Sequence, residues 1–134
     1  VSADAKRLIK GTNEALLAGL DVVKDGCRVG DISSVIEAVL NRYKLGIVRE
    51  LVGHGVGYEM HEPPEIPNYG VKGTGPVLRA GMTIAVEPIT TLGDYRIKGD
   101  SDGWTLRTRD GSLSAQFEHT VLITKTGCEI LTEM

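Results

Sequence analysis

Residues 31–46 read DISSVIEAVLNRYKLG and contain the clearest amphipathic pattern in the chain. Apolar residues recur there every three or four positions, which is the spacing of one face of an α-helix. The residues that form this stripe are Ile32, Val35, Ile36, Val39, Leu40 and Tyr43. We expect Asp31 to cap the start of this helix and Gly46 to end it.

The preceding segment predicts a second helix. Its apolar residues recur at similar spacings, and they are Leu8, Ile9, Ala15, Leu16, Leu20 and Val23. Ser2 is the expected N-cap, and Asp4 stands where a carboxylate favours the helix dipole. Residues 24–26, Lys-Asp-Gly, are expected to end this helix.

After Gly46 the pattern changes to that of β-strands. Residues 82–86 (MTIAV) and 120–124 (TVLIT) are short runs rich in β-branched residues. Residues 105–108 alternate and are followed by turn residues, which predicts a hairpin with residues 113–119.

Residues 53–81 are rich in glycine and proline and show little periodicity, so we expect a long functional loop there. Helices followed by strands indicate an α+β fold, with two helices packed on a mainly antiparallel sheet. The 134 residues suit one domain, residues 1–134.

The composition excludes several classes of function. The net charge of −3 and the 4% of aromatic residues argue against binding of nucleic acid. No apolar run reaches the length of a membrane span. Cys27 and Cys128 do not form a disulfide framework, and free thiols in a reducing cytoplasm are the favoured interpretation.

Four places hold side chains suited to metal binding or proton transfer: His54, His61, Glu87 and the pair Glu118–His119. His54 stands between two glycines, so a ligand can approach its ring, although a lone histidine of this kind more often hydrogen-bonds a turn. Glu87 ends an apolar strand and therefore needs a counter-charge unless it faces water. Glu118 is expected to project from a sheet face into the fold, with the same need.

Four segments together resemble the bacterial-type (type I) methionine aminopeptidases, in order and in spacing. These segments are GHGVG at 53–57, MHEPPEIPNYG at 60–70, GMTIAVEPI at 81–89 and DGWTLRTRDGSLSAQFEHT at 102–120. The resemblance extends through nearly the whole chain, including both predicted helices. It implies the C-terminal half of a pita-bread fold and the removal of the initiator methionine from nascent polypeptides.

The resemblance also implies a role for each candidate residue. His54 and Glu87 would bind one of two divalent metal ions, and Glu118 would bridge both. His61 would contact the scissile amide of the substrate, and Met60 and Trp104 would line the pocket for its methionine side chain. Glu87 is in addition expected to accept a proton from the attacking water. Mixed histidine and carboxylate ligands suit manganese, iron, cobalt or zinc.

One departure from the family pattern bears on activity. The family uses five protein ligands, and the first two are aspartates on a hairpin before the first helix seen here. The sequence therefore predicts that this chain is inactive by itself and needs the N-terminal half as a partner, whether separate or lost. Two alternatives are a non-catalytic peptide- or protein-binding module on the same fold and an unrelated α+β domain with a mononuclear site.

Overall fold

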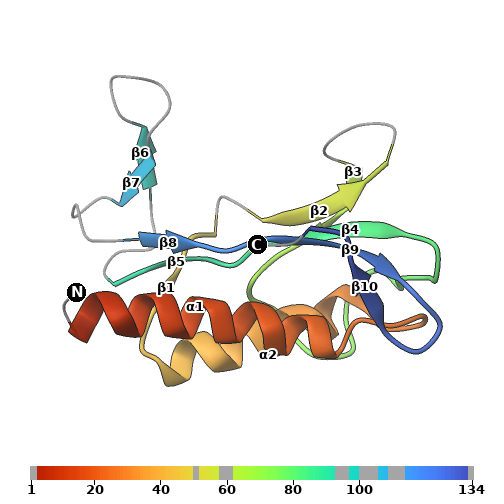
Figure 1. Cartoon of the computed structure of the whole chain (residues 1–134), viewed down its shortest axis with the longest axis horizontal. Helices are drawn as coiled ribbons and strands as arrows, with labels where there is room; N and C mark the ends of the chain where they lie inside the picture. The colour runs from red at the N-terminus through yellow and green to blue at the C-terminus, as the bar shows by residue number, and fades with distance from the viewer. Residues whose placement is uncertain are drawn as a thin grey trace.

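The computed structural model describes residues 3–49, 52–57, 62–92, 97–99, 106–108 and 114–132. Helix α1 (Ala3–Asp21) and helix α2 (Val29–Arg42) lie along the same side of the β-strands (Figure 1). Both predicted helices are therefore confirmed. Helix α1 ends at Asp21, earlier than the predicted stop at residues 24–26, and the proposed cap Ser2 lies outside the described residues.

Both ends of α2 differ from the prediction. The N-cap is Arg28, and Asp31 is the third helical residue of a capping box. The Asp31 carboxylate accepts hydrogen bonds from the backbone N–H groups of Arg28 (2.9 Å) and Gly73 (2.8 Å), which lower the pKa of its carboxyl group. The helix ends at Arg42, and Lys44 adopts the left-handed conformation (φ 56°). Gly46 is already part of a strand, so its assignment as the helix stop was wrong.

The largest sheet is antiparallel throughout and has the strand order β10-β9-β4-β2-β3. Its strands are β2 (Gly53–Val56), β3 (Glu62–Ile66), β4 (Thr83–Val86), β9 (His119–Ile123) and β10 (Cys128–Ile130). Strands β4 and β9 confirm the two β-rich runs predicted from the sequence. The antiparallel sheets and the two helices confirm the α+β fold class.

Strands β2 and β3 occupy part of the segment that we expected to be a loop, so that expectation was wrong. The glycines of β2 interrupt the alternation of apolar and polar residues by which a strand is recognised in a sequence. They are needed because the backbones of neighbouring strands lie too close for a side chain. A Cβ atom on Gly53 would lie 2.4 Å from the carbonyl oxygen of Ala85, and one on Gly55 would lie 2.5 Å from that of Pro63. Strand β3 can contain two prolines because it is an edge strand, where missing N–H donors are tolerated.

The predicted hairpin between residues 105–108 and 113–119 was also wrong. Strand β7 (Leu106–Thr108) pairs with β6 (Ile97–Gly99), whereas β8 (Ser114–Gln116) joins a separate sheet of order β1-β5-β8. The other members of that sheet are β1 (Gly46–Ile47) and β5 (Ile89–Thr91). Local turn residues indicate where a chain reverses, but they do not select the partner of each strand.

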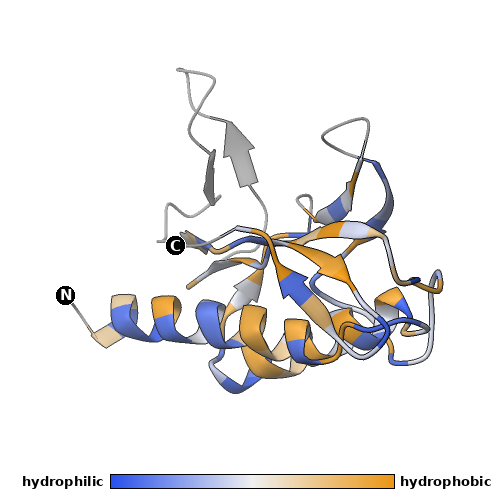
Figure 2. Ribbon diagram, turned by 45° about the vertical axis from the view of Figure 1, so that its right-hand side comes forward, coloured by the Kyte–Doolittle hydropathy of each residue, from blue (hydrophilic) through white to orange (hydrophobic). Residues whose placement is uncertain are grey.

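The hydrophobic core lies between the helices and the main sheet. Alternate residues of β4 and β9 pack against the buried faces of α1 and α2, and these are Ile84, Val86, Val121 and Ile123. Figure 2 shows the central strands as largely hydrophobic, whereas the helices alternate between hydrophobic and hydrophilic surface. Within the described residues, neither helix is long and apolar enough to cross a membrane.

Candidate metal centre

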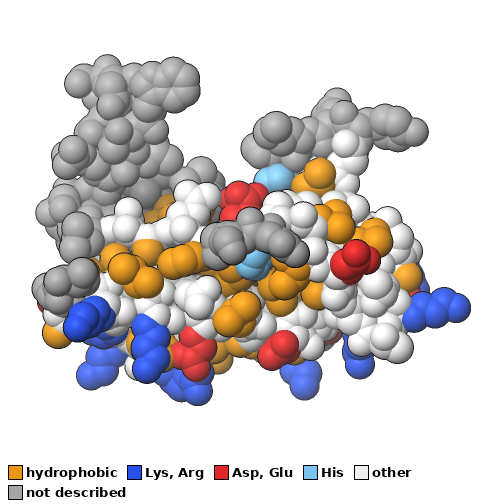
Figure 3. Space-filling view, viewed as in Figure 1, with side chains coloured by type: hydrophobic (Ala, Val, Ile, Leu, Met, Phe, Trp, Pro, Cys, Tyr) orange, Lys and Arg blue, Asp and Glu red, His pale blue; other side chains and the backbone are white. Residues whose placement is uncertain are grey.

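The strand register brings three predicted site residues to one face of the main sheet. His54 on β2 pairs with Ala85 on β4, so Glu87, two residues beyond Ala85, is its diagonal neighbour on the same face. Val86 pairs with His119, so continuing that register places Glu87 opposite Glu118. The helices cover the other face. In Figure 3 an acidic and a histidine side chain are visible on the side away from the helices, and other acidic side chains lie over the helices.

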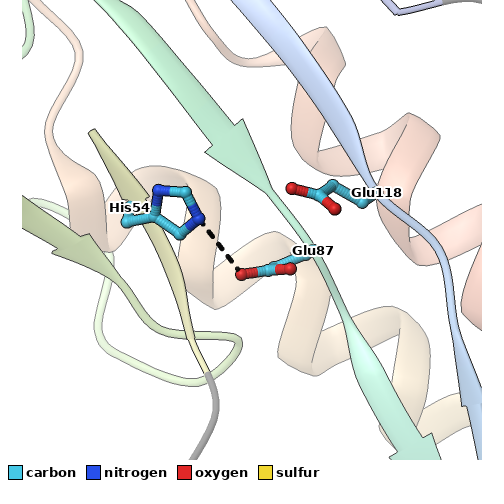
Figure 4. A group of neighbouring side chains, drawn as sticks. All are labelled: His54, Glu87 and Glu118. Carbon is cyan, nitrogen blue, oxygen red and sulfur yellow. Dashed lines mark ion pairs between the residues drawn. The ribbon is translucent and has the colours of Figure 1, made fainter. Parts of the chain in front are cut away.

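The ligand atoms of His54, Glu87 and Glu118 all lie within 4.8 Å of one another. Their side chains converge from three neighbouring segments of the sheet (Figure 4). His54 and Glu87 are largely buried, with side-chain exposures of 14% and 13%, and Nε2 of His54 lies 3.5 Å from Oε1 of Glu87. Glu118 is exposed, so the expectation that it projects into the fold was wrong. Sheet alternation turns Phe117 and His119 toward the interior and leaves Glu118 facing outward.

The imidazole of His54 is oriented by its backbone. Its Nδ1 atom lies 3.0 Å from the carbonyl oxygen of Gly55, which can only accept a hydrogen bond, so this contact places the proton on Nδ1. In the neutral ring Nε2 then presents its lone pair toward the Glu87 carboxylate. Two acceptors that face each other need a cation or a proton between them. Metal-binding histidines are generally oriented in this way, by a hydrogen bond from the ring nitrogen that does not bind the metal.

The electrostatics of Glu87 also favour a cation at this position. Burial and the nearby charge of Glu118 raise the pKa of the Glu87 carboxyl group, while His54 and a hydrogen bond from Gln116 oppose that rise. A divalent ion would offset both the desolvation and the repulsion between the two carboxylates. One imidazole nitrogen and two carboxylates form a donor set suited to manganese, iron, cobalt or zinc. The residues present therefore fit a divalent metal ion.

The remaining predicted site residues cannot be placed. His61, Met60 and Trp104 lie outside the described residues, so their roles stay predictions. His119, the neighbour of Glu118, is buried, and its Nδ1 lies 3.0 Å from the hydroxyl of Thr132. His119 pairs with Val86, which packs in the core, so His119 lies on the inner face of β9, away from the three converging side chains.

Two carboxamides beside Glu87 were not identified from the sequence. The Asn68 side chain donates a hydrogen bond to the Glu87 carbonyl oxygen (3.0 Å), and the Gln116 side chain donates one to Oε2 of Glu87 (3.2 Å). Gln116 stands two residues before Glu118, and Asn68 belongs to the IPNYG segment. Their membership of those motifs was the available signal, but amides carry no charge pattern that marks them as neighbours of an acid.

The chain is similar in sequence and in structure to bacterial methionine aminopeptidases. The chain is 46% identical to methionine aminopeptidase B of Synechocystis over 98% of its length, and 47% identical to the methionine aminopeptidase of Clostridium acetobutylicum over 98%. The crystal structure of the methionine aminopeptidase from Thermotoga maritima matches all of the chain, with a TM-score of 0.95 and 48% identity. The predicted resemblance and the pita-bread fold are thereby confirmed.

The matches cover only part of each relative. The chain spans 48% and 53% of the Synechocystis and Clostridium proteins and 54% of the Thermotoga chain, which is about half of their length. The model of metallopeptidase family M24 matches residues 1–125. Together, these matches show that the chain belongs to metallopeptidase family M24.

Proposed function

We propose that this chain supplies three ligands of a dinuclear metal centre that removes the initiator methionine from nascent polypeptides. The convergence of His54, Glu87 and Glu118 within 4.8 Å carries the proposal. Membership of a metallopeptidase family, which implies the use of divalent metal ions, supports it. In this proposal His54 and Glu87 would hold one ion, and Glu118 would help to hold both, because a carboxylate offers two oxygen atoms.

The chemistry fits hydrolysis of a peptide bond. When bound, a pair of divalent ions would lower the pKa of a nearby water toward neutrality and so supply the attacking hydroxide. We further propose that the Glu87 carboxylate would accept a proton from the attacking water. His61 donates a hydrogen bond to the substrate where negative charge develops, and Met60 and Trp104 contact the methionine side chain.

The proposal includes a partner. The resemblance to the bacterial methionine aminopeptidases implies two further aspartate ligands in an N-terminal half, and this chain spans about half the length of its relatives. We infer that the chain acts only when it is joined by such a half, because three ligands on one sheet face cannot hold two ions firmly. A cytoplasmic location is proposed as well, in keeping with the free cysteines Cys27 and Cys128.

Complementation tests this function directly. The chain would be combined with the part of the Thermotoga maritima enzyme that it does not cover, and hydrolysis of a Met-Ala-Ser peptide would be measured with added Mn²⁺ or Co²⁺. We expect turnover by the combination and negligible turnover by either part. The same combination carrying Glu118→Gln is the matched control and should lose metal as well as rate.

Two results would oppose the proposal in different ways. Robust turnover by the 134-residue chain alone would refute the need for a second half. A folded combination that binds no metal and hydrolyses no peptide would favour the non-catalytic binding module instead. Metal analysis distinguishes the enzyme from the binding module, because the enzyme requires about two ions in each complete site and the module requires none.

A further inference from the structure

Glu87 is held by the side-chain amides of two residues, Asn68 and Gln116. Its main chain is held by Asn68, whose Nδ2 donates to the Glu87 carbonyl oxygen at 3.0 Å. Asn68 is 1% exposed, and among the described residues its Oδ1 atom has no hydrogen-bond partner. Burying the Asn68 side chain with no hydrogen bond to its oxygen atom costs free energy. The hydrogen bond that Asn68 donates to Glu87 therefore explains why an asparagine stands at this buried position.

With the main chain fixed, the carboxylate of Glu87 can still rotate about its side-chain bonds. Gln116 limits this rotation, since its Nε2 donates to Oε2 of Glu87 at 3.2 Å. The other carboxylate oxygen, Oε1, is the one that lies 3.5 Å from Nε2 of His54. One oxygen is therefore tethered while the other faces the imidazole.

The hydrogen bond between Gln116 and Glu87 joins two segments that are far apart in the sequence. Gln116 belongs to β8, in the β1-β5-β8 sheet, where it pairs with Ile89. Glu87 is two residues before Ile89, so the two side chains are diagonal neighbours on one face. Glu118 follows Gln116 by two residues. The same short segment thus presents one acid to the site and holds the orientation of another.

We propose that Gln116 is a positioning residue that fixes the Glu87 carboxylate, leaving Oε1 free to bind metal beside His54. The inference rests on the proposed function, because it takes Glu87 as a metal ligand. Hydrogen-bond partners of metal-binding carboxylates orient the ligand before the ion arrives, and their loss generally costs 10–100-fold in metal affinity or activity. Gln116 does not touch substrate or metal in this scheme and acts only through Glu87.

The test measures metal affinity apart from catalysis. In the reconstituted protein, Gln116→Met keeps the length of the side chain and removes its amide donor. Ser114→Ala is the control, because Ser114 is exposed on the same face of β8. Binding of Co²⁺ would be measured by calorimetry and by the visible spectrum of the bound ion, and thermal unfolding would be followed in a chelator. We expect Gln116→Met to bind Co²⁺ ~10-fold or more weakly, with a changed spectrum and an unfolding midpoint equal to that of Ser114→Ala.

A second background separates failure of this inference from failure of the proposed function. Glu87→Gln should weaken Co²⁺ binding, and adding Gln116→Met to it should cause no further loss, because the residue to be positioned is gone. If Glu87→Gln leaves Co²⁺ affinity unchanged, the metal role of Glu87 is wrong and the proposed function fails. If Glu87→Gln weakens binding but Gln116→Met binds as well as Ser114→Ala, only the positioning role is overturned.

Discussion

The tight approach of strands β2 and β4 gives a prediction that links stability to the metal centre. Gly53 is the first residue of β2, and its backbone is not in the left-handed region. A glycine is therefore required here because there is no room for a side chain, and not because of the backbone conformation. A Cβ atom there would lie 2.4 Å from the Ala85 carbonyl oxygen and 3.2 Å from Cβ of Ile66. Gly53→Ala therefore forces two paired strands apart by about 1 Å to reach ordinary van der Waals separation.

The expected cost follows from the nature of the colliding atoms. Both neighbours are rigid, since one is backbone and the other is a branch point in a buried side chain, so neither can rotate away. Overpacking of this kind costs about 1–3 kcal/mol of the free energy of unfolding. At roughly 4 °C for each kcal/mol in a chain of this size, the thermal midpoint should fall by roughly 4–12 °C.

A matched glycine controls for the general effect of adding a methyl group. A Cβ atom on Gly127 would meet nothing within 4 Å, and its φ is also outside the left-handed region. Gly127→Ala should be neutral or should stabilise the chain by about 0.4–1 kcal/mol, because alanine restricts the unfolded state. Thermal or urea unfolding of both variants in a chelator measures the difference.

The same variant should affect the metal centre, because Ala85 is the cross-strand partner of His54. A displacement of β2 relative to β4 changes the distance between the imidazole and Glu87, and sites of this kind tolerate only about 0.5 Å of misplacement. Gly53→Ala should therefore bind Co²⁺ more weakly than Gly127→Ala. An unfolding midpoint for Gly53→Ala equal to or above that of Gly127→Ala would show that the strands do not pack as closely as described.

Three further outcomes are expected. In the reconstituted protein, Glu118→Gln should lose bound metal, whereas His61→Ala should keep it and lose ~10²–10³-fold in rate; metal analysis beside peptide hydrolysis checks this, and the reverse pattern would exchange the two roles. Because the pKa of Glu87 is raised in the folded chain, the folded state holds the Glu87 proton more tightly than the unfolded state. The free energy of unfolding without metal should therefore decline as the pH rises from the ordinary pKa of 4.5 through the raised pKa of the folded state. Urea unfolding across this pH range should give a smaller decline for Glu87→Gln, and an equal decline in both proteins would contradict the shift. Ile84→Ala, at a fully buried core position, should cost about 2–5 kcal/mol in urea unfolding, and a cost below 1 kcal/mol would place that side chain outside the core.

Features that depend on local order along the chain could be predicted from the residues alone. Helical periodicity located α1 and α2, and β-rich runs located β4 and β9, since burial of one face imposes a repeat on the residues of that element. Motif order was equally informative. It singled out His54, Glu87 and Glu118 as one group, although nothing local to any of them distinguishes a ligand from an ordinary polar residue.

Features that depend on which segments become neighbours could be known only from the folded chain. The glycines that disguise β2 as a loop are explained by backbone atoms of β3 and β4. The pairing of β7 with β6, and the exposure of Glu118, follow from long-range choices of partner and face that local turn residues do not encode. Gln116 and Glu87 are 29 positions apart, and their hydrogen bond exists because two sheets meet at the end of β4. Such contacts come from the packing of whole elements, which no short stretch of residues specifies.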